Sequence, residues 1–189
     1  MTKILTPFVI LALCMSVSFA EEEKPIRPAL IVIDLQNDFR KYMDESDLKS
    51  AKTYINYALD IFHKKELPVF VVEHTDKWTG EPEPGSEGFQ TISELELRDS
   101  DARITKNYGN SFRETDLGTR LKELNVNTVF LCGFAADGCV ISTYHGAVDR
   151  DLNTFLIENA LVSSDHKKTT GIQNIFNSVP IQAVYLMTR

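Results

Sequence analysis

The stretch TVFLCGFAADGCVISTYHGAVDR, residues 128–150, contains the pattern that decides the fold. Its first five residues form a short apolar run, which is typical of a strand buried on both faces. A turn of small residues begins at Gly133, and helical spacing follows over residues 138–150. A buried strand, a tight turn and a helix in direct succession predict one unit of an α/β fold.

The same alternation runs through the rest of the chain. Further short apolar runs that predict strands lie at 29–33, 69–72, 102–105, 154–157 and 181–187. Helical spacing occurs at 47–67, 115–124 and 168–177. Strands that alternate with helices form an open parallel sheet between two helical layers. We therefore predict a three-layer, doubly wound α/β fold, with a mostly parallel six-stranded sheet and helices on both faces.

Size and composition fit one globular domain and argue against one class of partner. The chain has 189 residues, of which 43% are hydrophobic and 25% charged, as in an ordinary domain with a hydrophobic core. The formal net charge is -7, whereas a surface that binds nucleic acid is usually basic. We therefore expect no nucleic-acid partner.

Residues 1–20 have the layout of a secretory signal peptide. Lys3 gives a positive start, residues 4–19 are almost wholly apolar, and small residues precede a run of three glutamates. The apolar run is short for a membrane span. We expect cleavage after Ala20, which leaves residues 21–189 as one exported domain, periplasmic or secreted, without a membrane anchor.

Three predicted strands lead into side chains that can take part in catalysis. Asp34 follows the first strand, Lys106 follows the third, and Cys139 follows the turn after the fourth. The carboxyl ends of parallel strands share one edge of the sheet, where active sites gather. Taken singly, these residues could be a turn cap, a solvated charge and a small buried side chain. Together they predict a catalytic group.

Cys139 is predicted at the start of a helix, where unpaired N–H groups favour negative charge. We expect this position and the Lys106 ammonium to lower the pKa of the thiol, because the thiolate is the nucleophilic form. Asp34 would take the thiol proton and later pass it to a leaving group. The backbone N–H groups of Ala135 and Cys139 would hold an oxyanion.

Three segments resemble motifs of the isochorismatase-like cysteine hydrolases. DLQNDF at 34–39 resembles their D-x-Q-x-D-F opening, and KNYGNSFRETDL at 106–117 resembles their K-x5-F-x2-T-x-L segment. GFAADGCVIST at 133–143 resembles G-x-x-T-x-x-C-V-x-x-T, with Ala136 in place of the common Thr or Ser. Glu158-Asn159-Ala160 lies where the family usually has an Asp-Ala pair.

The resemblance implies an isochorismatase-like, Rossmann-like fold and an Asp-Lys-Cys triad, here Asp34, Lys106 and Cys139. It also implies a cis peptide bond between Phe134 and Ala135, and a homo-oligomer. Nicotinamidases of this family bind a metal through an Asp-x-His pair and further histidines.

This chain lacks such a pair in the corresponding region, because only His63 and His74 lie between Asp34 and Lys106. A zinc site needs three or four ligands. We therefore predict no metal and no other cofactor.

Residues next to the triad positions are candidates for the substrate pocket, although core packing would explain most of them equally well. The candidates are Phe39, Tyr108, Phe112, Phe134 and His74. Residues 74–100 are polar and contain several Gly and Pro, which predicts a long loop that helps to shape the pocket. We expect Cys132 to be a buried strand residue and not a disulfide partner of Cys139.

The function we expect is hydrolysis of a small amide-type C–N bond through a Cys139 thioester. Two alternatives stay open at this point. One is vinyl ether hydrolysis of the isochorismatase type, in which Asp34 acts as an acid and the thiol is dispensable. The other is a non-catalytic exported binding module on the same fold.

Overall fold

The structure is a computed structural model that describes residues 25–189, so the expected signal peptide lies outside the described residues. The strands are β1 (Pro28–Ile33), β2 (Val69–His74), β3 (Ala102–Lys106), β4 (Thr128–Gly133), β5 (Asn153–Leu161) and β6 (Ser178–Val179). The helices are α1 (Glu45–Lys64), α2 (Leu117–Glu123), α3 (Ile141–Val148), α4 (His166–Ile175) and α5 (Ile181–Met187). A 3-10 helix, η1 (Asn37–Tyr42), and a π-helical turn, η2 (Ala136–Val140), complete them.

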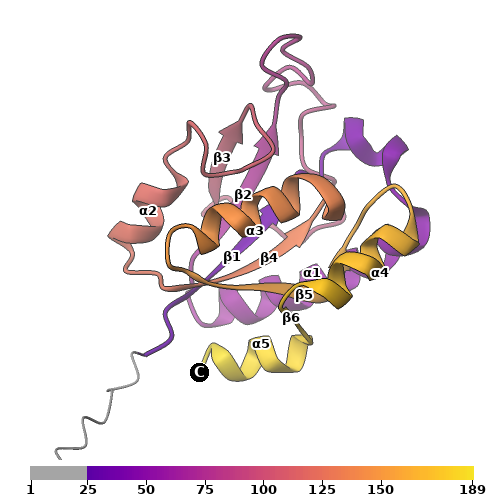
Figure 1. Ribbon diagram of the computed structural model, residues 1–189. Coiled ribbons are helices and arrows are strands. Elements are labelled where there is room, and N and C mark those ends of the chain that lie inside the picture. The colour runs from indigo at the N-terminus through magenta and orange to yellow at the C-terminus, as the bar shows by residue number, and fades with distance from the viewer. Residues whose placement is uncertain (1–24) are drawn as a thin grey trace, which may run out of the picture.

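The six strands form one parallel sheet in the order β3-β2-β1-β4-β5-β6 (Figure 1). β1 and β4 are neighbours at its centre, and every residue of both strands is buried. Apolar runs without alternation are what a strand covered on both faces requires. The predicted doubly wound α/β architecture is therefore confirmed.

Helices cover both faces of the sheet (Figure 1). On one face, Leu30 and Val32 of β1 share a core with α1, and α5 packs beside α1. On the other face, the alternate β1 residues Ala29, Ile31 and Ile33 share a second core with α2 and α3. The alternation of strand side chains therefore divides the interior into two cores.

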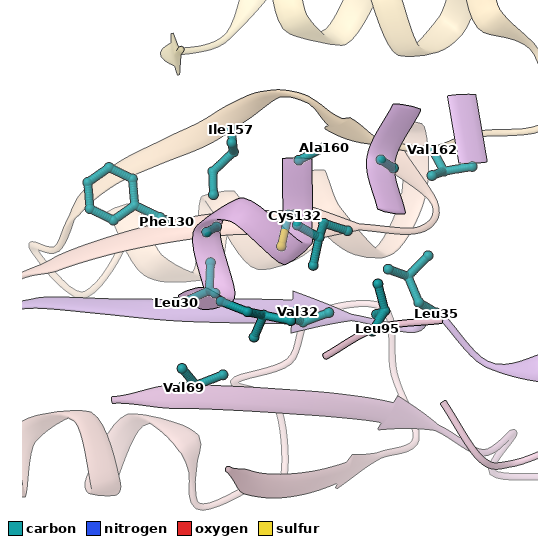
Figure 2. Close-up of a cluster of buried hydrophobic side chains, with 14 of the residues drawn as sticks. Leu30, Val32, Leu35, Val69, Leu95, Phe130, Cys132, Ile157, Ala160 and Val162 are labelled. Carbon is teal, nitrogen blue, oxygen red and sulfur yellow. The ribbon is translucent and has the colours of Figure 1, made fainter. Parts of the chain in front are cut away.

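Cys132 belongs to the core that α1 covers. Figure 2 shows its side chain inside the buried cluster, with the sulfur directed toward β1, and the Sγ lies 3.6 Å from the carbonyl oxygen of Ile31. Both cysteines of the described residues are free. The expectation of a buried strand residue without a disulfide is confirmed for Cys132.

The expected strand at 181–187 is wrong, because this segment is the helix α5. The strand partner of β5 is instead the two-residue β6, and Pro180 follows it directly. Proline has no N–H to donate, so it cannot continue a ladder. Ile181, Val184 and Met187 then turn inward at a helical spacing, which a short apolar run does not distinguish from a strand.

The connection between β4 and α3 also differs in detail from the expected single helix over residues 138–150. It begins with the π-helical turn η2, which places Cys139 ahead of α3, and α4 packs against this turn. No helix within residues 25–189 is both long enough and apolar enough to cross a membrane.

Candidate active site

The carboxyl ends of four adjacent strands bring the candidate residues together. Lys106 ends β3 and His74 ends β2, and these two residues are register partners. Asp34 follows β1 directly, and Cys139 follows β4 after the turn. The sheet order β3-β2-β1-β4 therefore places residues that are far apart in sequence along one continuous edge.

Asp34 and Lys106 form a buried ion pair. The Lys106 Nζ donates to Asp34 Oδ2 at 2.7 Å, and the side chains are 0% and 2% exposed for Lys106 and Asp34. The backbone of Asp34 has a φ of 51°, a conformation that is uncommon for a residue with a side chain. The second carboxylate oxygen, Oδ1, is buried and has no hydrogen-bond partner among the described residues. One oxygen is thus held by the lysine, and the other is free to accept a proton.

The expectation of a lowered pKa at Cys139 is wrong. The pKa of this thiol is raised to about 12, chiefly by burial and then by the neighbouring Asp34 carboxylate, while Lys106 acts in the opposite direction. Loss of hydration therefore outweighs the favourable field of the helix start and of the lysine. The thiol rests in its protonated form, so an attack by sulfur needs a base that removes the proton.

His74 joins the ion pair from the strand between its partners. Its Nδ1 lies 3.3 Å from the Lys106 Nζ and accepts from this ammonium. Burial, followed by the Lys106 charge, lowers the pKa of His74 and keeps its ring neutral. A neutral ring is required here, because a protonated Nδ1 cannot accept from an ammonium.

Gln36 holds the backbone of His74 in place, and it was not among the site residues predicted from the sequence. Its Nε2 donates to the His74 carbonyl at 3.0 Å, and its Oε1 accepts from the His74 N–H at 2.6 Å. The side chain is completely buried. The only sequence feature that could have indicated Gln36 is its place in the DLQNDF segment. Its residue type gives no such indication, because Gln36 bonds only to backbone groups of His74.

Three of the five expected pocket residues lie together. The Phe39 ring is 6.1 Å from the His74 ring and 6.2 Å from the Phe134 ring, measured between centroids. Phe39 comes from η1 and Phe134 from the turn after β4, so both lie at the carboxyl edge of the sheet. The three rings form an aromatic wall beside the Asp34–Lys106 pair.

The other two expected pocket residues lie elsewhere. Tyr108 lies near the surface, where the Lys77 Nζ donates to its hydroxyl and the Arg113 guanidinium lies 3.8 Å from its ring centre. Phe112 is buried in the α2–α3 core, with the Arg150 guanidinium 4.7 Å from its ring centre. The structure brings neither ring to the Phe39 group.

The turn after β4 offers backbone N–H groups to an anion. The Ala135 carbonyl accepts from the N–H groups of Gly138 and Val140, and the Cys139 N–H between them does not bond to it. The Ala135 N–H has no acceptor among the described residues. The Phe134–Ala135 peptide bond is cis, as the resemblance implied. The two expected oxyanion donors therefore lie on one turn.

The long loop is anchored to the same edge. Residues after β1 pair with it through the bonds Asn37 N–H to Gln90 O at 3.0 Å and Asp38 N–H to Gly88 O at 3.0 Å. Away from these anchors the loop projects beyond β2 and β3 at the top of Figure 1, and Trp78 is 82% exposed. The anchored part of the loop lies next to the aromatic wall, because Phe39 directly follows Asn37 and Asp38.

Within the described part of the chain, no group of three or more His, Cys, Asp or Glu side chains could hold a metal ion. His63, the other histidine between Asp34 and Lys106, lies at the opposite end of β2. Its Nε2 is 2.8 Å from Asp101 Oδ1, and this pair is buried. It contributes to packing around the start of β3 and does not face Cys139.

Comparisons with known proteins identify the family. The isochorismatase domain model matches residues 28–183. The uncharacterized isochorismatase family protein YrdC of Bacillus subtilis is 31% identical over 143 residues, which cover 74% of this chain and 74% of that protein.

One further relative and one protein of similar fold have more specific names. A secreted isochorismatase effector of Verticillium dahliae is 24% identical over 139 residues, which cover 72% of this chain and 73% of that protein. The crystal structure of N-carbamoylsarcosine amidase from Thermoplasma acidophilum superposes with a TM-score of 0.71 at 23% identity. The match covers 82% of this chain and 95% of the amidase chain, and at this identity it shows a shared fold.

Proposed function

The chain belongs to the isochorismatase family of hydrolases, and we propose that it is an exported cysteine hydrolase that cleaves a small amide-type C–N bond. The observation that carries the proposal is the arrangement at the sheet edge. A protonated thiol lies beside a buried carboxylate that has one oxygen bound to Lys106 and one oxygen free.

The reaction begins with proton transfer from the Cys139 Sγ to Asp34, since the thiol is not ionised at rest. The sulfur then forms a bond to the substrate carbonyl carbon. The oxygen takes up negative charge and binds the N–H groups of Ala135 and Cys139. Asp34 passes its proton to the nitrogen, the C–N bond breaks, and the amine leaves a thioester on Cys139.

Water completes the cycle. Asp34 takes a proton from a water molecule, which attacks the thioester carbon, and the proton returns to the sulfur as the acid leaves. Lys106 holds the Asp34 carboxylate in place throughout the reaction. Its charge also lowers the pKa of the Cys139 thiol and so opposes the effect of burial. The aromatic wall of Phe39, His74 and Phe134 would contact a small, flat substrate.

The names of two similar proteins support details of this proposal. The amidase that shares the fold is named for cleavage of an amide-type bond, and the Verticillium relative is named as secreted. We further propose that the working form is a homo-oligomer that acts on a small molecule without a cofactor, and that residues 1–20 direct export.

One observation also favours vinyl ether hydrolysis as a second candidate. The resting thiol is protonated, so Asp34 could act as an acid on a vinyl ether without help from sulfur. The two candidates differ in what they require of Cys139. Amide hydrolysis needs the sulfur as a nucleophile, whereas vinyl ether hydrolysis does not.

A substrate panel of small amides, ureas and isochorismate, tested on purified protein, separates the candidates. We expect Cys139→Ala to lower amide or urea turnover by at least about a thousandfold, because the nucleophile is lost. Cys132→Ala is the matched control, since it removes the other free thiol from a strand core and should retain turnover. Full amide turnover by Cys139→Ala would refute the thioester mechanism, and turnover of isochorismate alone would favour the second candidate.

A further inference from the structure

A large cavity lies at the edge of the sheet opposite the triad. It has a volume of about 700 Å³. Arg27 precedes β1, Asn127 precedes β4 and Leu152 precedes β5, and Gly118, Thr119, Leu121 and Lys122 belong to α2, so the cavity lies at the amino ends of these strands, beside α2. A volume of this size is within the range of small-molecule sites.

The charged residues that line this cavity are all cations. They are Arg27, Lys122 and Arg150, and no acidic side chain of residues 25–189 lines the cavity. Within residues 25–189, none of the three forms an ion pair with a carboxylate. Asp149 and Asp151 flank Arg150 in the sequence, but neither lines the cavity. In a chain with a net charge of -7, three uncompensated cations around one cavity form a local positive field.

Neutral groups hold Arg150 in place. Its Nη1 donates to the Gly146 carbonyl at 2.8 Å, and its guanidinium stacks over the Phe112 ring. A Cβ on Gly118 would lie 3.5 Å from the Arg150 Nε, so α2 passes close to this side chain. The guanidinium is therefore positioned in advance, while its charge is not neutralised and several of its donors remain free.

The cavity lining combines buried apolar side chains with more exposed polar ones. Phe112, Leu121 and Val126 are buried. Thr115, Thr119 and Asn125 add hydroxyl and amide groups. A ligand that satisfies both parts has a flat apolar body and one negative group. We propose that this cavity is a second binding site that takes a small aromatic carboxylate, with its anionic group on Arg150 and Lys122.

A neighbouring cavity of about 560 Å³ shows that the charge pattern is specific to the first one. It also borders α2, through Arg120 and Leu124. Its lining, however, includes Glu66 and Asp101 besides its cations, so both signs of charge are present. The Arg120 guanidinium stacks over the Phe70 ring at 5.5 Å and donates to the Arg103 carbonyl at 3.4 Å. Arg120 is therefore a close structural match for Arg150, but it lies outside the cationic cavity.

Calorimetric titration of the purified protein with benzoate at low ionic strength tests the site. We expect saturable binding of benzoate and none of benzyl alcohol, its uncharged analogue. Arg150→Gln and Lys122→Gln should each weaken benzoate binding by about tenfold, because a hydrogen bond between charged groups is lost. Arg120→Gln should leave the affinity unchanged. The prediction does not depend on turnover, so it stands or fails separately from the proposed hydrolase function.

Any of the following results in these titrations would overturn the proposal: equal affinity for benzyl alcohol, absence of benzoate binding, or a benzoate affinity that neither cavity variant changes. Lys122→Gln keeps the test decisive if Arg150→Gln fails to fold, since Lys122 is exposed on α2.

The three glutamates at 21–23 lie just before the cavity residues in the sequence and could compete with a ligand. A triple variant, Glu21→Gln, Glu22→Gln and Glu23→Gln, is therefore titrated in parallel. Unchanged affinity supports the small carboxylate as the occupant. A gain of about tenfold would assign the cavity to the acidic segment of the chain itself and refute the proposal.

Discussion

The two edges of the sheet differ in how their charged side chains are paired and buried. At the carboxyl edge, Asp34 and Lys106 are buried and paired with each other. At the amino edge, Arg27, Lys122 and Arg150 surround an open cavity without a carboxylate partner in the described chain. Buried, paired charges have fixed positions and little hydration, which suits the transfer of a proton. Exposed, unpaired cations keep their attraction for an outside anion, which suits binding.

The largest effect should follow from removal of the base at the carboxyl edge. Asp34→Asn keeps the size of the side chain but removes its ability to take the thiol proton. We expect turnover to fall by about 10²- to 10⁴-fold, as measured by steady-state kinetics on the best substrate of the panel. Near-normal turnover in Asp34→Asn would mean that another group removes the proton.

The next largest effect should be on stability. Lys106→Met replaces the ammonium by an apolar side chain of similar length and leaves Asp34 buried without its partner. We expect a loss of about 3–5 kcal/mol in the free energy of unfolding, measured in urea.

The double variant Asp34→Asn/Lys106→Met is the control, because it removes both charges together. It should lose less than the sum of the two single variants. Strict additivity of the three free energies would argue against a coupled buried pair.

A smaller effect should appear in the reactivity of Cys139 itself. Because burial and Asp34 raise the pKa of this thiol, alkylation by iodoacetamide at pH 7.5 should be much slower than that of free cysteine. The rate should rise with pH well beyond pH 9. In Asp34→Asn the rate at pH 7.5 should increase by about tenfold, since one source of the raised pKa is removed. Turnover and alkylation should thus respond to this substitution in opposite directions.

The smallest effect should follow from removal of a cation at the amino edge. Lys122→Gln without ligand should change the free energy of unfolding by less than about 0.5 kcal/mol, since no carboxylate loses its partner. The comparison with Lys106→Met in the same urea titration contrasts the two edges directly. A large loss in Lys122→Gln would reveal a structural role for the amino-edge cations.

The sequence was sufficient to predict the parallel sheet and the meeting of Asp34, Lys106 and Cys139. Both depend on rules that hold for any parallel sheet, because strand ends share an edge whatever the side chains around them. The pocket residues were predicted less well, since Tyr108 and Phe112 are close to Lys106 in sequence but lie in a surface stack and in the core. The direction in which each aromatic ring points depends on packing between elements, which residue type does not specify.

The pKa of Cys139 and the role of Gln36 were beyond the sequence for related reasons. Position at a helix start favours the thiolate, but the extent of burial decides the balance, and burial is a property of the folded chain. Gln36 acts through two bonds to the backbone of His74, and every residue has the same backbone groups. The cationic cavity was equally hidden, because its three charges come from segments more than 20 residues apart in the chain.

The protonated resting thiol also bears on how easily Cys139 is oxidised. Oxidants and disulfides react with thiolates, so the rate of oxidative damage follows the ionised fraction. Because burial raises the pKa of Cys139, a far smaller fraction of this thiol is ionised at pH 7 than of a free cysteine. For a protein exported as proposed, the sulfur would become vulnerable mainly when substrate binding recruits the carboxylate of Asp34. The same burial that makes the nucleophile dependent on a base therefore acts as its antioxidant protection.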